Sequence, residues 1–449
     1  MRHAAIIDIG KTNVKLALVD LATRAEVAVR TTPNLVRPGP PWPHFDTEAQ
    51  WDFLCDALRE MAVRHGVDAI GVTTHGACAA LLDAQGDLAA PVLDYEHDGP
   101  DSYRAAYEAI RPPFARTGSP GLPLGLNLGA QLFWQLRVDP GLRDRIAHVV
   151  LWPQYWGHRL TGAVASDICS LGCHTDLWEP GARGFSSLPA ALGLHGRMAP
   201  PRLPGEVLGV LRPALQAALG IGAVPVICGL HDSNASLLPH LRARAAPFAV
   251  VSTGTWVISM AVGGADVALD PTRDTLINVN ALGDPVPSAR FMGGREYELM
   301  RPQGDAQGDA ADAEAVLTRG VMLRPAVVRD SGPFQGRQGG WTVEPATDGQ
   351  RAVALGYYLG LMTAESLAQI GAAGPSVIEG PFAANPWFCA MLRAATGRAV
   401  VRSPMRTGTA IGTALLFQDS APLAEPPAAE PAPDPRLRAY AAQWRAHAG

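Results

Sequence analysis

Asp232 is the residue with the clearest potential for catalysis in this chain. It lies in the segment LHDSNAS at 230–236, between His231 and small polar residues. The apolar run VPVIC at 224–228 predicts a buried strand that ends just before Asp232. A carboxylate at the end of a buried strand can act as a general base, and an aspartate there can equally cap the next helix. We therefore treat Asp232 as the candidate general base and keep helix capping as the alternative.

A polar turn near residue 10 suits phosphate binding. Residues 4–20, AAIIDIGKTNVKLALVD, predict a strand, a tight turn and a returning strand. Backbone N–H groups in such a turn can point at a phosphate, while lysine, hydroxyl and amide groups bind its oxygens. The residues available for this are Gly10, Lys11, Thr12, Asn13 and Lys15. Asp8, beside the turn, can hold Mg²⁺ through water, and an ordinary polar hairpin is the alternative for the whole segment.

A second hairpin repeats this design at 248–260, FAVVSTGTWVISM. Aligning the two segments places Ser252 on Asp8 and Gly254 on Gly10. Two related hairpins, one in each half of the chain, indicate an internal duplication with a nucleotide bound between the halves. We therefore divide the chain into two domains, 1–243 and 244–449.

Between the hairpins, polar and aromatic residues are placed where a substrate could bind. His75 follows the predicted strand 68–73, and open α/β sheets bind ligands at such strand ends. Asp94 begins the acidic run DYEHD, which either binds hydroxyl groups or forms a solvated turn. Gln154 and Tyr155 belong to the segment WPQYW, whose rings and amide are of the kind that binds sugars. A structural histidine and packed core aromatics are the alternatives.

Composition limits the classes of partner. The net charge is −5 and the pI is near 6.2, so neither nucleic acid nor a membrane surface is an expected partner. No apolar run reaches the length of a membrane span, and a strand predicted from residue 4 leaves no room for a signal peptide. The six cysteines are scattered, which favours reduced thiols in the cytoplasm. We expect a cytoplasmic monomer or homodimer that binds small molecules.

Apolar spacing also predicts the elements that position these residues. Helices are expected over 47–66 and over 352–370, where glycines allow close packing. The small residues of 407–417 predict a helix packed tightly on its neighbour. Residues 419–435 are rich in Pro, Ala and Glu and predict a flexible strap before a last helix at 437–447.

Taken in order, the motifs resemble those of the FGGY family of carbohydrate kinases. They are DIGKTN at 8–13, HDSNAS at 231–236, STGTW at 252–256 and the glycine turn at Gly380. The similarity spans nearly the whole chain and is strongest to the branch that contains rhamnulokinase and fuculokinase. The resemblance implies an α/β fold class: a two-domain actin-like (ribonuclease H-like) ATPase fold. Each domain would be a mixed β-sheet flanked by helices, with ligands in the interdomain cleft.

The same resemblance implies a role for each motif. Asp232 would be the general base, and Gly76 and His231 would contact the sugar. The phosphates would face residues 10–13 from one side, and Gly254 and Thr255 from the other. The residues that would lie toward the nucleoside are Asn280, Gly380 and Asn385.

Three features depart from the family pattern. The glycine run on the adenine side is reduced to Gly380-Pro381-Phe382, which bears on the nucleotide preference. The acidic run at 94–96 lacks the arginine that is common among relatives, and His75 replaces a tryptophan. The last two differences leave the identity of the sugar open.

The sequence thus predicts an ATP-dependent sugar kinase that requires Mg²⁺. Asp232 would accept the proton of a hydroxyl, expected to be primary, on a small ketose such as L-rhamnulose or L-fuculose, while the γ-phosphate is transferred. Asp8 and Asp232 would hold the metal through water. One alternative is a non-catalytic sugar and ATP sensor of the same fold, and another is an ATPase coupled to a protein partner.

Overall fold

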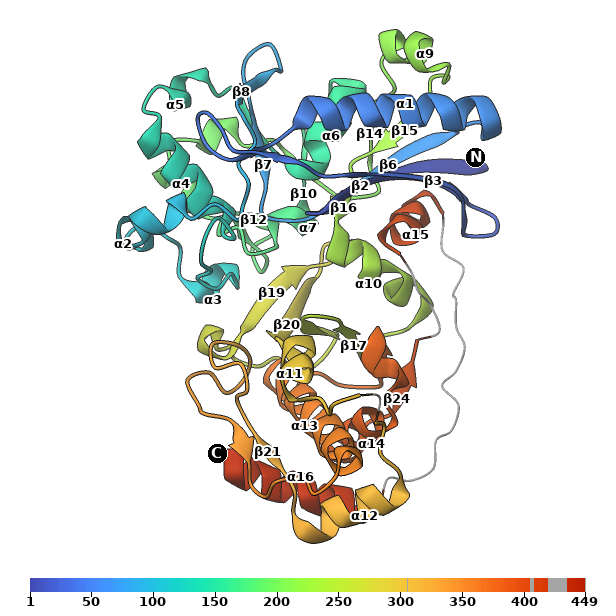
Figure 1. Ribbon diagram of the computed structural model, residues 1–449. Helices are drawn as coiled ribbons and strands as arrows, with labels where there is room; N and C mark the ends of the chain where they lie inside the picture. Colours follow the sequence, from blue (N-terminus) through green and yellow to red (C-terminus); the bar gives the residue numbers. More distant parts are fainter. Residues whose placement is uncertain (305, 404–407, 419–433, 449) are drawn as a thin grey trace. The chain divides into compact units, whose positions relative to one another are not determined.

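The chain forms two compact units, each with its own mixed β-sheet. The computed structural model describes residues 1–304, 306–403, 408–418 and 434–448 (Figure 1). Unit 1 comprises Met1–Ala243, Ile277–Pro285 and the described part of Thr407–Leu423. Unit 2 comprises Arg244–Leu276, Val286–Arg406 and Ala424–Gly449, again as far as described. The predicted strap lies mostly at 419–433, outside the described residues.

The main sheet of unit 1 has the strand order β14-β15-β6-β1-β2-β3, with β16 also paired to β6. The pairs β1–β2, β2–β3 and β14–β15 are antiparallel, whereas β1, β15 and β16 run parallel to β6. The strands are β1 His3–Ile9, β2 Asn13–Asp20, β3 Ala25–Pro33, β6 Ala69–Thr74, β14 Val207–Val210, β15 Pro225–Ile227 and β16 Leu230–His231.

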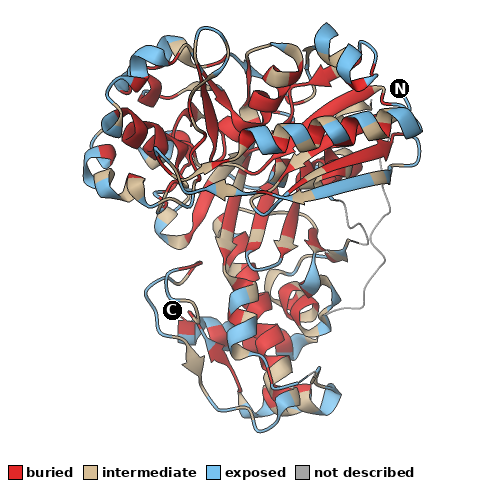
Figure 2. Ribbon diagram, turned by 45° about the horizontal axis from the view of Figure 1, so that its top comes forward, coloured by how far each residue is buried: buried red, intermediate tan, exposed pale blue. Residues whose placement is uncertain are grey.

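The alternation of side chains along β1 explains how this sheet is covered on both faces. Ala5, Ile7 and Ile9 belong to one buried cluster together with helix α1, Thr47–His65. Ala4 and Ile6 point to the other face and pack against Ala410 and Ala414 of helix α15, Thr409–Ala414. Figure 2 shows most strands as buried, whereas β3 is largely exposed.

A smaller sheet and several helices complete unit 1. Its order is β8-β7-β9, and its apolar residues pack with those of α4. The strands of this sheet are β7 Ala79–Leu82, β8 Leu88–Ala90 and β9 His148–Leu151. Three short two-stranded pairs lie apart from it: β4 Val36–Arg37 and β5 His44–Phe45, β10 Ser166–Asp167 and β13 Pro201–Arg202, and β11 Trp178–Glu179 and β12 Gly184–Phe185. The helices are α2 Arg104–Glu108, α3 Phe114–Thr117, α4 Leu128–Val138, α5 Leu142–Arg145, α6 Trp152–Thr161, α7 Ile168–Leu171, α8 Leu188–Ala191, α9 Pro213–Leu219 and α10 Asp232–Ala243.

The sheet of unit 2 repeats the antiparallel hairpin and parallel neighbour seen in unit 1. Its order is β19-β20-β18-β17-β23-β24, with β17–β18 antiparallel and β17–β23 and β23–β24 parallel. The strands are β17 Phe248–Thr253, β18 Val257–Val262, β19 Thr275–Val279, β20 Pro285–Phe291, β23 Ser376–Glu379 and β24 Val400–Arg402, with a short pair β21 Leu323–Arg324 and β22 Gly340–Trp341.

Long helices bury the core of unit 2. Helix α13, Asp348–Gln369, packs on α14, Pro386–Thr396, where Gly356 and Gly360 leave no room for a Cβ atom. This confirms the predicted close packing at the glycines. The other helices are α11 Gly293–Met300, α12 Ala310–Arg319 and α16 Pro435–Ala448, and α16 places Tyr440 and Trp444 in the same core.

Two segments lie in a different unit from the one that the predicted division gave them. The predicted boundary at 243 assigns everything after it to the second domain, yet Ile277–Pro285 and α15 belong to unit 1. The physical reason for α15 is its apolar contact with β1 and with α10. Within the described ranges, no helix combines the length and apolar character that a membrane span requires.

Candidate active site

Asp232 is delivered to the end of the unit 1 sheet by β16. Leu230 and His231 pair with Thr73 and Thr74 of β6 in parallel register, so Asp232 follows the carboxyl end of parallel strands. Asp232 is also the first residue of α10, where the helix dipole favours a negative charge. Burial raises the pKa of Asp232 above its ordinary value, although its side chain keeps 32% exposure. The carboxylate is therefore both partly desolvated and accessible.

Two buried histidines lie near this carboxylate. The ring of His231 lies with Nε2 3.2 Å from Asp232 Oδ1. His75 donates from Nδ1 to the carbonyl of Gly76 over 2.9 Å, which fixes the tautomer and leaves Nε2 as an acceptor. That buried Nε2 has no hydrogen-bond partner among the described residues. Burial lowers the pKa of each histidine to about 4, so both are neutral near pH 7.

Position 76 requires glycine because the backbone there passes close to the ring of His231. A Cβ atom at position 76 would lie 2.9 Å from His231 Nε2, nearer than real Cβ contacts allow. The predicted sugar-side residues Gly76, His75 and His231 therefore stand together beside Asp232.

The predicted phosphate turn is held by a residue that sequence reasoning missed. Asn34 donates from Nδ2 to the carbonyl of Gly10 over 2.8 Å, and its backbone N–H donates to the carbonyl of Thr12. The N–H of Gly10 itself donates to the carbonyl of Asn13, so the turn is closed by its own backbone. Nothing in the sequence around Asn34 signals this role, because the contact spans 24 residues.

The two lysines of the hairpin lie beside acidic side chains. Lys11 forms ion pairs with Asp94 and with Glu96, the latter at 3.1 Å. Its Nζ also lies over the ring of Tyr95, 4.8 Å from the ring centre. Lys15 pairs with Glu26 at 2.6 Å. Lys11 was predicted to bind phosphate and Asp94 to bind sugar, and the two side chains belong to one cluster with Tyr95 and Glu96.

Asp8 lies on β1 next to a hydroxyl from the far end of the chain. Thr409 of α15 donates a hydrogen bond from Oγ1 to Asp8 Oδ2. Burial raises the pKa of Asp8, and the nearby charge of Asp232 raises it further. Two carboxylates that repel each other in this way are a donor set that suits Mg²⁺, which commonly takes one or two carboxylates and completes its shell with water and phosphate. Within the described residues no group of three or more possible ligands forms a metal cluster.

Gln154 and Tyr155 take different places. Gln154 is fully buried and donates to the carbonyl of Cys228 over 2.8 Å, just before β16. It therefore supports the strand that carries Asp232. The Tyr155 hydroxyl accepts a hydrogen bond from Arg159 at 3.2 Å and lines a separate pocket of unit 1.

Unit 2 holds a pocket of about 590 Å³ beside its hairpin. Three predicted ATP-site residues, Gly254, Thr255 and Asn385, are among those that line it. Pro381 and Phe382, named from the sequence as part of the adenine-side turn, also line it, whereas sequence reasoning missed Gly294, Arg295, Tyr297, Glu298, Gln307 and Ala384. The Gly-Gly-Arg turn into α11 was a visible signal for the first two of these, whereas isolated residues such as Gln307 gave none.

A threonine fastens the hairpin of unit 2 to the Gly380 turn. Thr253 donates from Oγ1 to the carbonyl of Glu379 over 2.5 Å and accepts from the N–H of Phe382 over 3.1 Å. Gly380 has φ of 80°, and a Cβ atom there would lie 2.0 Å from the carbonyl oxygen of Thr253. The turn at 380 therefore needs glycine on both counts.

The two predicted nucleoside-side asparagines both organise backbone. Asn385 caps α14 by accepting from the N–H groups of Trp387 and Phe388, and it also lines the unit 2 pocket. Asn280 lies in unit 1, in the turn between β19 and β20, and accepts from the N–H groups of Leu282 and Asp284. It is not among the residues that line the unit 2 pocket.

Comparison with known proteins gives consistent results for both parts of the chain. The model of the N-terminal domain of the FGGY family of carbohydrate kinases matches residues 3–239, and that of the C-terminal domain matches 245–426. An L-fuculokinase from Salmonella typhi is 29% identical over 269 residues, which cover 58% of this chain and 56% of that protein. The chain thus spans about half the length of the curated relatives it matches.

Solved structures match over a greater length. A carbohydrate kinase from Novosphingobium aromaticivorans shares 34% identity with a TM-score of 0.91, covering 99% of this chain and 97% of the other. A xylulose kinase from Rhodospirillum rubrum, 20% identical with a TM-score of 0.75 over 99% and 97% of the two chains, shows the same fold. The predicted fold class, two actin-like domains each with a mixed sheet flanked by helices, is confirmed.

Proposed function

The chain belongs to the FGGY family of carbohydrate kinases, and from that premise we propose that it transfers the γ-phosphate of ATP to a hydroxyl of a small ketose. The observation that supports this best is the placement of Asp232. Its carboxylate is partly accessible, stands at the end of parallel strands, and lies beside the neutral His231 and near the neutral His75. A carboxylate in such a site is better suited to remove a proton from an alcohol than to pair with a cationic side chain.

Asp232 is proposed to act as the general base. Its raised pKa makes it a stronger base than an exposed aspartate. As the sugar oxygen attacks the γ-phosphorus, its proton passes to a carboxylate oxygen of Asp232, and the bond from phosphorus to the β,γ-bridging oxygen breaks. His75 Nε2, an acceptor without a hydrogen-bond partner among the described residues, is proposed to accept a hydrogen bond from a second hydroxyl and so to orient the sugar.

The unit 2 pocket is proposed to take the nucleoside of ATP. Its volume of about 590 Å³ is in the range of small-molecule sites, and Gly254 and Thr255 line it. Residues 10–13 are proposed to face the phosphates. Asp8 and Asp232 would hold Mg²⁺, which when bound neutralises charge on the transferring group.

The substrate is proposed to be a neutral ketose such as L-fuculose, L-rhamnulose or xylulose, phosphorylated at a primary hydroxyl. Support comes from the names of relatives, an L-fuculokinase and a xylulose kinase, and from the site itself. The charge of Lys11 is already matched by Asp94 and Glu96, so a carboxylate on the sugar would find no unmatched cation there.

Replacing Asp232 by asparagine tests the base directly. Turnover should fall by a factor of roughly a thousand or more, while sugar affinity changes little, because asparagine keeps the shape and loses the basicity. Asp52→Asn, an exposed aspartate of α1, is the matched control and should leave turnover unchanged. Near-normal turnover of the Asp232→Asn protein would rule out this role. ATP hydrolysis measured with and without sugar separates a kinase from a sensor, which would show no turnover.

A further inference from the structure

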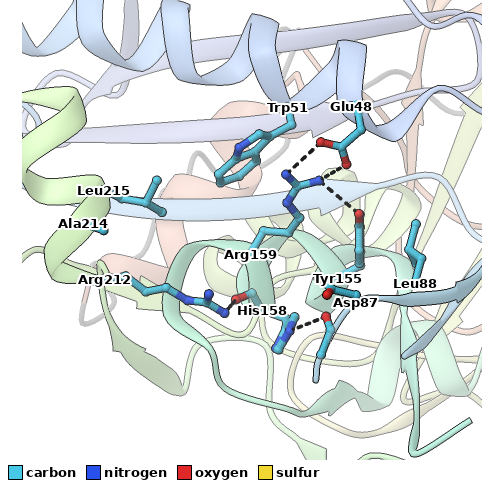
Figure 3. A pocket seen from close by; sticks show the side chains of 11 residues that line it. Glu48, Trp51, Asp87, Leu88, Tyr155, His158, Arg159, Arg212, Ala214 and Leu215 are labelled. Carbon is cyan, nitrogen blue, oxygen red and sulfur yellow. Dashed lines mark hydrogen bonds and ion pairs between the residues drawn. The ribbon is translucent and has the colours of Figure 1, made fainter. Parts of the chain in front are cut away.

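Unit 1 contains a second pocket that the proposed function does not use. It measures about 590 Å³ and lies between α1, the turn before β8, α6 and the start of α9 (Figure 3). Of the residues predicted to bind sugar, only Tyr155 lines it. The pocket is formed entirely within unit 1, so its shape depends on that unit alone.

Four charged side chains line this pocket, two of each sign. Arg159 is held by Glu48, with contacts of 2.5 and 3.2 Å, and its guanidinium lies 4.4 Å from the ring centre of Trp51. Arg212 donates to the carbonyl of His158 over 2.8 Å. Figure 3 shows Arg212 and Asp87 on either side of His158.

Arg212 and Asp87 are the two charges not already matched. Among the described residues, no carboxylate lies within 4 Å of Arg212, and no lysine, arginine or histidine nitrogen lies within 4 Å of Asp87. The pocket therefore offers strong donors and a strong acceptor to a ligand that enters it.

The balance of charge indicates the class of ligand. A phosphate or carboxylate would gain from Arg212 but would meet Glu48 and Asp87, and an ammonium group would meet the two arginines. A hydroxyl group donates and accepts at once, so a ligand with several hydroxyls can offer a donor to Asp87 and an acceptor to Arg212 without carrying a net charge. We propose that this pocket is a second, non-catalytic site for a neutral sugar or polyol.

Aromatic contacts connect this pocket with the proposed active site. The ring of Tyr155 stacks on Trp152 with 5.4 Å between ring centres and 10° between planes. Trp152 in turn lies 6.4 Å from the ring of His75. A ligand that moves Tyr155 thus acts on His75 through one intervening ring. This coupling rests on the proposed function, whereas binding in the pocket does not.

Calorimetric titration without nucleotide tests the proposal. Xylulose, L-fuculose and L-rhamnulose are titrated in turn into the full chain, and the sugar that binds most tightly is carried forward. We expect the unaltered protein to bind two equivalents of sugar per chain and the Arg212→Gln and Asp87→Asn variants to bind one. Each substitution should weaken sugar binding in this pocket by roughly tenfold or more. Arg64→Gln alters an exposed arginine of α1 that lies outside the pocket and pairs with Glu60, and this variant should keep two equivalents.

Three results would overturn the second site. These are a single equivalent for all three sugars, two equivalents retained in both pocket variants, or tighter binding of gluconate than of the neutral sugars at the event that Arg212→Gln removes. Phosphorylation assays separate the two proposals. Two binding events without phosphorylation of any sugar would refute the proposed kinase activity and support the second site. Phosphorylation with a single binding event would support the kinase activity and refute the second site.

Discussion

His75 and His231 remain neutral over the physiological range because burial lowers the pKa of each to about 4. Neither ring can therefore supply a proton or a positive charge at pH 7. The acid–base behaviour of this part of unit 1 belongs to carboxylates, among them Asp232, whose side chain keeps 32% exposure. The histidines act instead by shape and by hydrogen bonding.

The pH dependence of catalysis should reflect this arrangement. The base must be ionised, and the pKa of Asp232 is raised, so kcat/KM should fall as pH drops through a value above the ordinary aspartate value near 4. Profiles of kcat/KM between roughly pH 4.5 and 9 measure this dependence, because the ordinary pKa values of aspartate and histidine are distinguished over that range. A rate that instead falls as pH rises through about 6 to 7 would indicate an essential protonated histidine and contradict the assignment.

Gly76 gives a sharper test of the sugar side. Gly76→Ala would place a methyl group 2.9 Å from His231 Nε2, and a shift of this ring atom would alter its 3.2 Å contact with Asp232. We expect KM for the sugar to rise by roughly tenfold or more, with KM for ATP unchanged. Gly181→Ala, where a Cβ meets nothing within 4 Å, is the matched control. Equal sugar KM values for the two variants would show that the His231 contact is unimportant.

At the scale of elements, two strand hairpins provide the frames of the proposed sites. In each unit the hairpin pairs with a parallel strand, β6 for β1 and β23 for β17. In unit 2 the Thr253 hydroxyl adds two hydrogen bonds that connect the end of β17 to the turn after β23. The turn that lines the pocket is therefore fastened to the hairpin by one hydroxyl group in addition to the strand pairing.

Thr253→Val should loosen that turn. Valine has nearly the shape of threonine but leaves the carbonyl of Glu379 and the N–H of Phe382 without this partner. KM for ATP should rise by roughly tenfold, and sugar affinity measured without nucleotide should stay unchanged. Thr253→Ser keeps the hydroxyl and should restore ATP binding. A serine variant as impaired as the valine variant would assign the effect to the lost methyl contact instead.

Both hairpins were predictable because strand, turn and returning strand are contiguous in sequence. The segments 4–20 and 248–260 contain β1 with β2 and β17 with β18. Helix α1 was equally visible from its apolar spacing and from Gly66, which ends it. Local pattern is sufficient wherever the residues that determine an element lie within one or two turns of each other.

The partners of side chains were not predictable in the same way. Lys11 meets Asp94 across 83 positions, and no local rule favours that contact over a phosphate. Tyr155 shares a motif with Gln154, yet consecutive positions of a helix point in different directions, so the two serve different sites. The unit 2 pocket draws on separate segments around 254, 294, 307 and 381, whose meeting depends on the folded sheet.

At the scale of the whole molecule, unit 1 is assembled from three separate stretches of chain. The last of them contributes α15, which covers one face of the sheet and bonds Asp8 through Thr409. It also packs on α10, the helix that begins with Asp232, where a Cβ on Gly412 would lie 1.9 Å from the carbonyl oxygen of Ala235.

Gly412→Ala should therefore disturb both stability and catalysis. The two helices must separate to admit the methyl group, which costs about 1 to 3 kcal/mol in a well-packed interior. We expect a lower midpoint of thermal unfolding and a reduced kcat, because α10 shifts with Asp232 at its start. Gly408→Ala, whose nearest neighbour would be 3.9 Å away, is the control and should behave like the unaltered protein. An unchanged midpoint for Gly412→Ala would contradict the close packing.

The discontinuity of unit 1 has a consequence for biosynthesis. After Ala243 has been synthesised, roughly 170 further residues must be added before Thr409 exists, which takes about 10 to 30 s at common rates of translation. Throughout that interval the sheet face formed by Ala4, Ile6, Ala17, Val19 and Ala69 lacks its cover from Ala410 and Ala414. The nascent chain on the ribosome thus presents an apolar surface that molecular chaperones can bind until α15 has been synthesised.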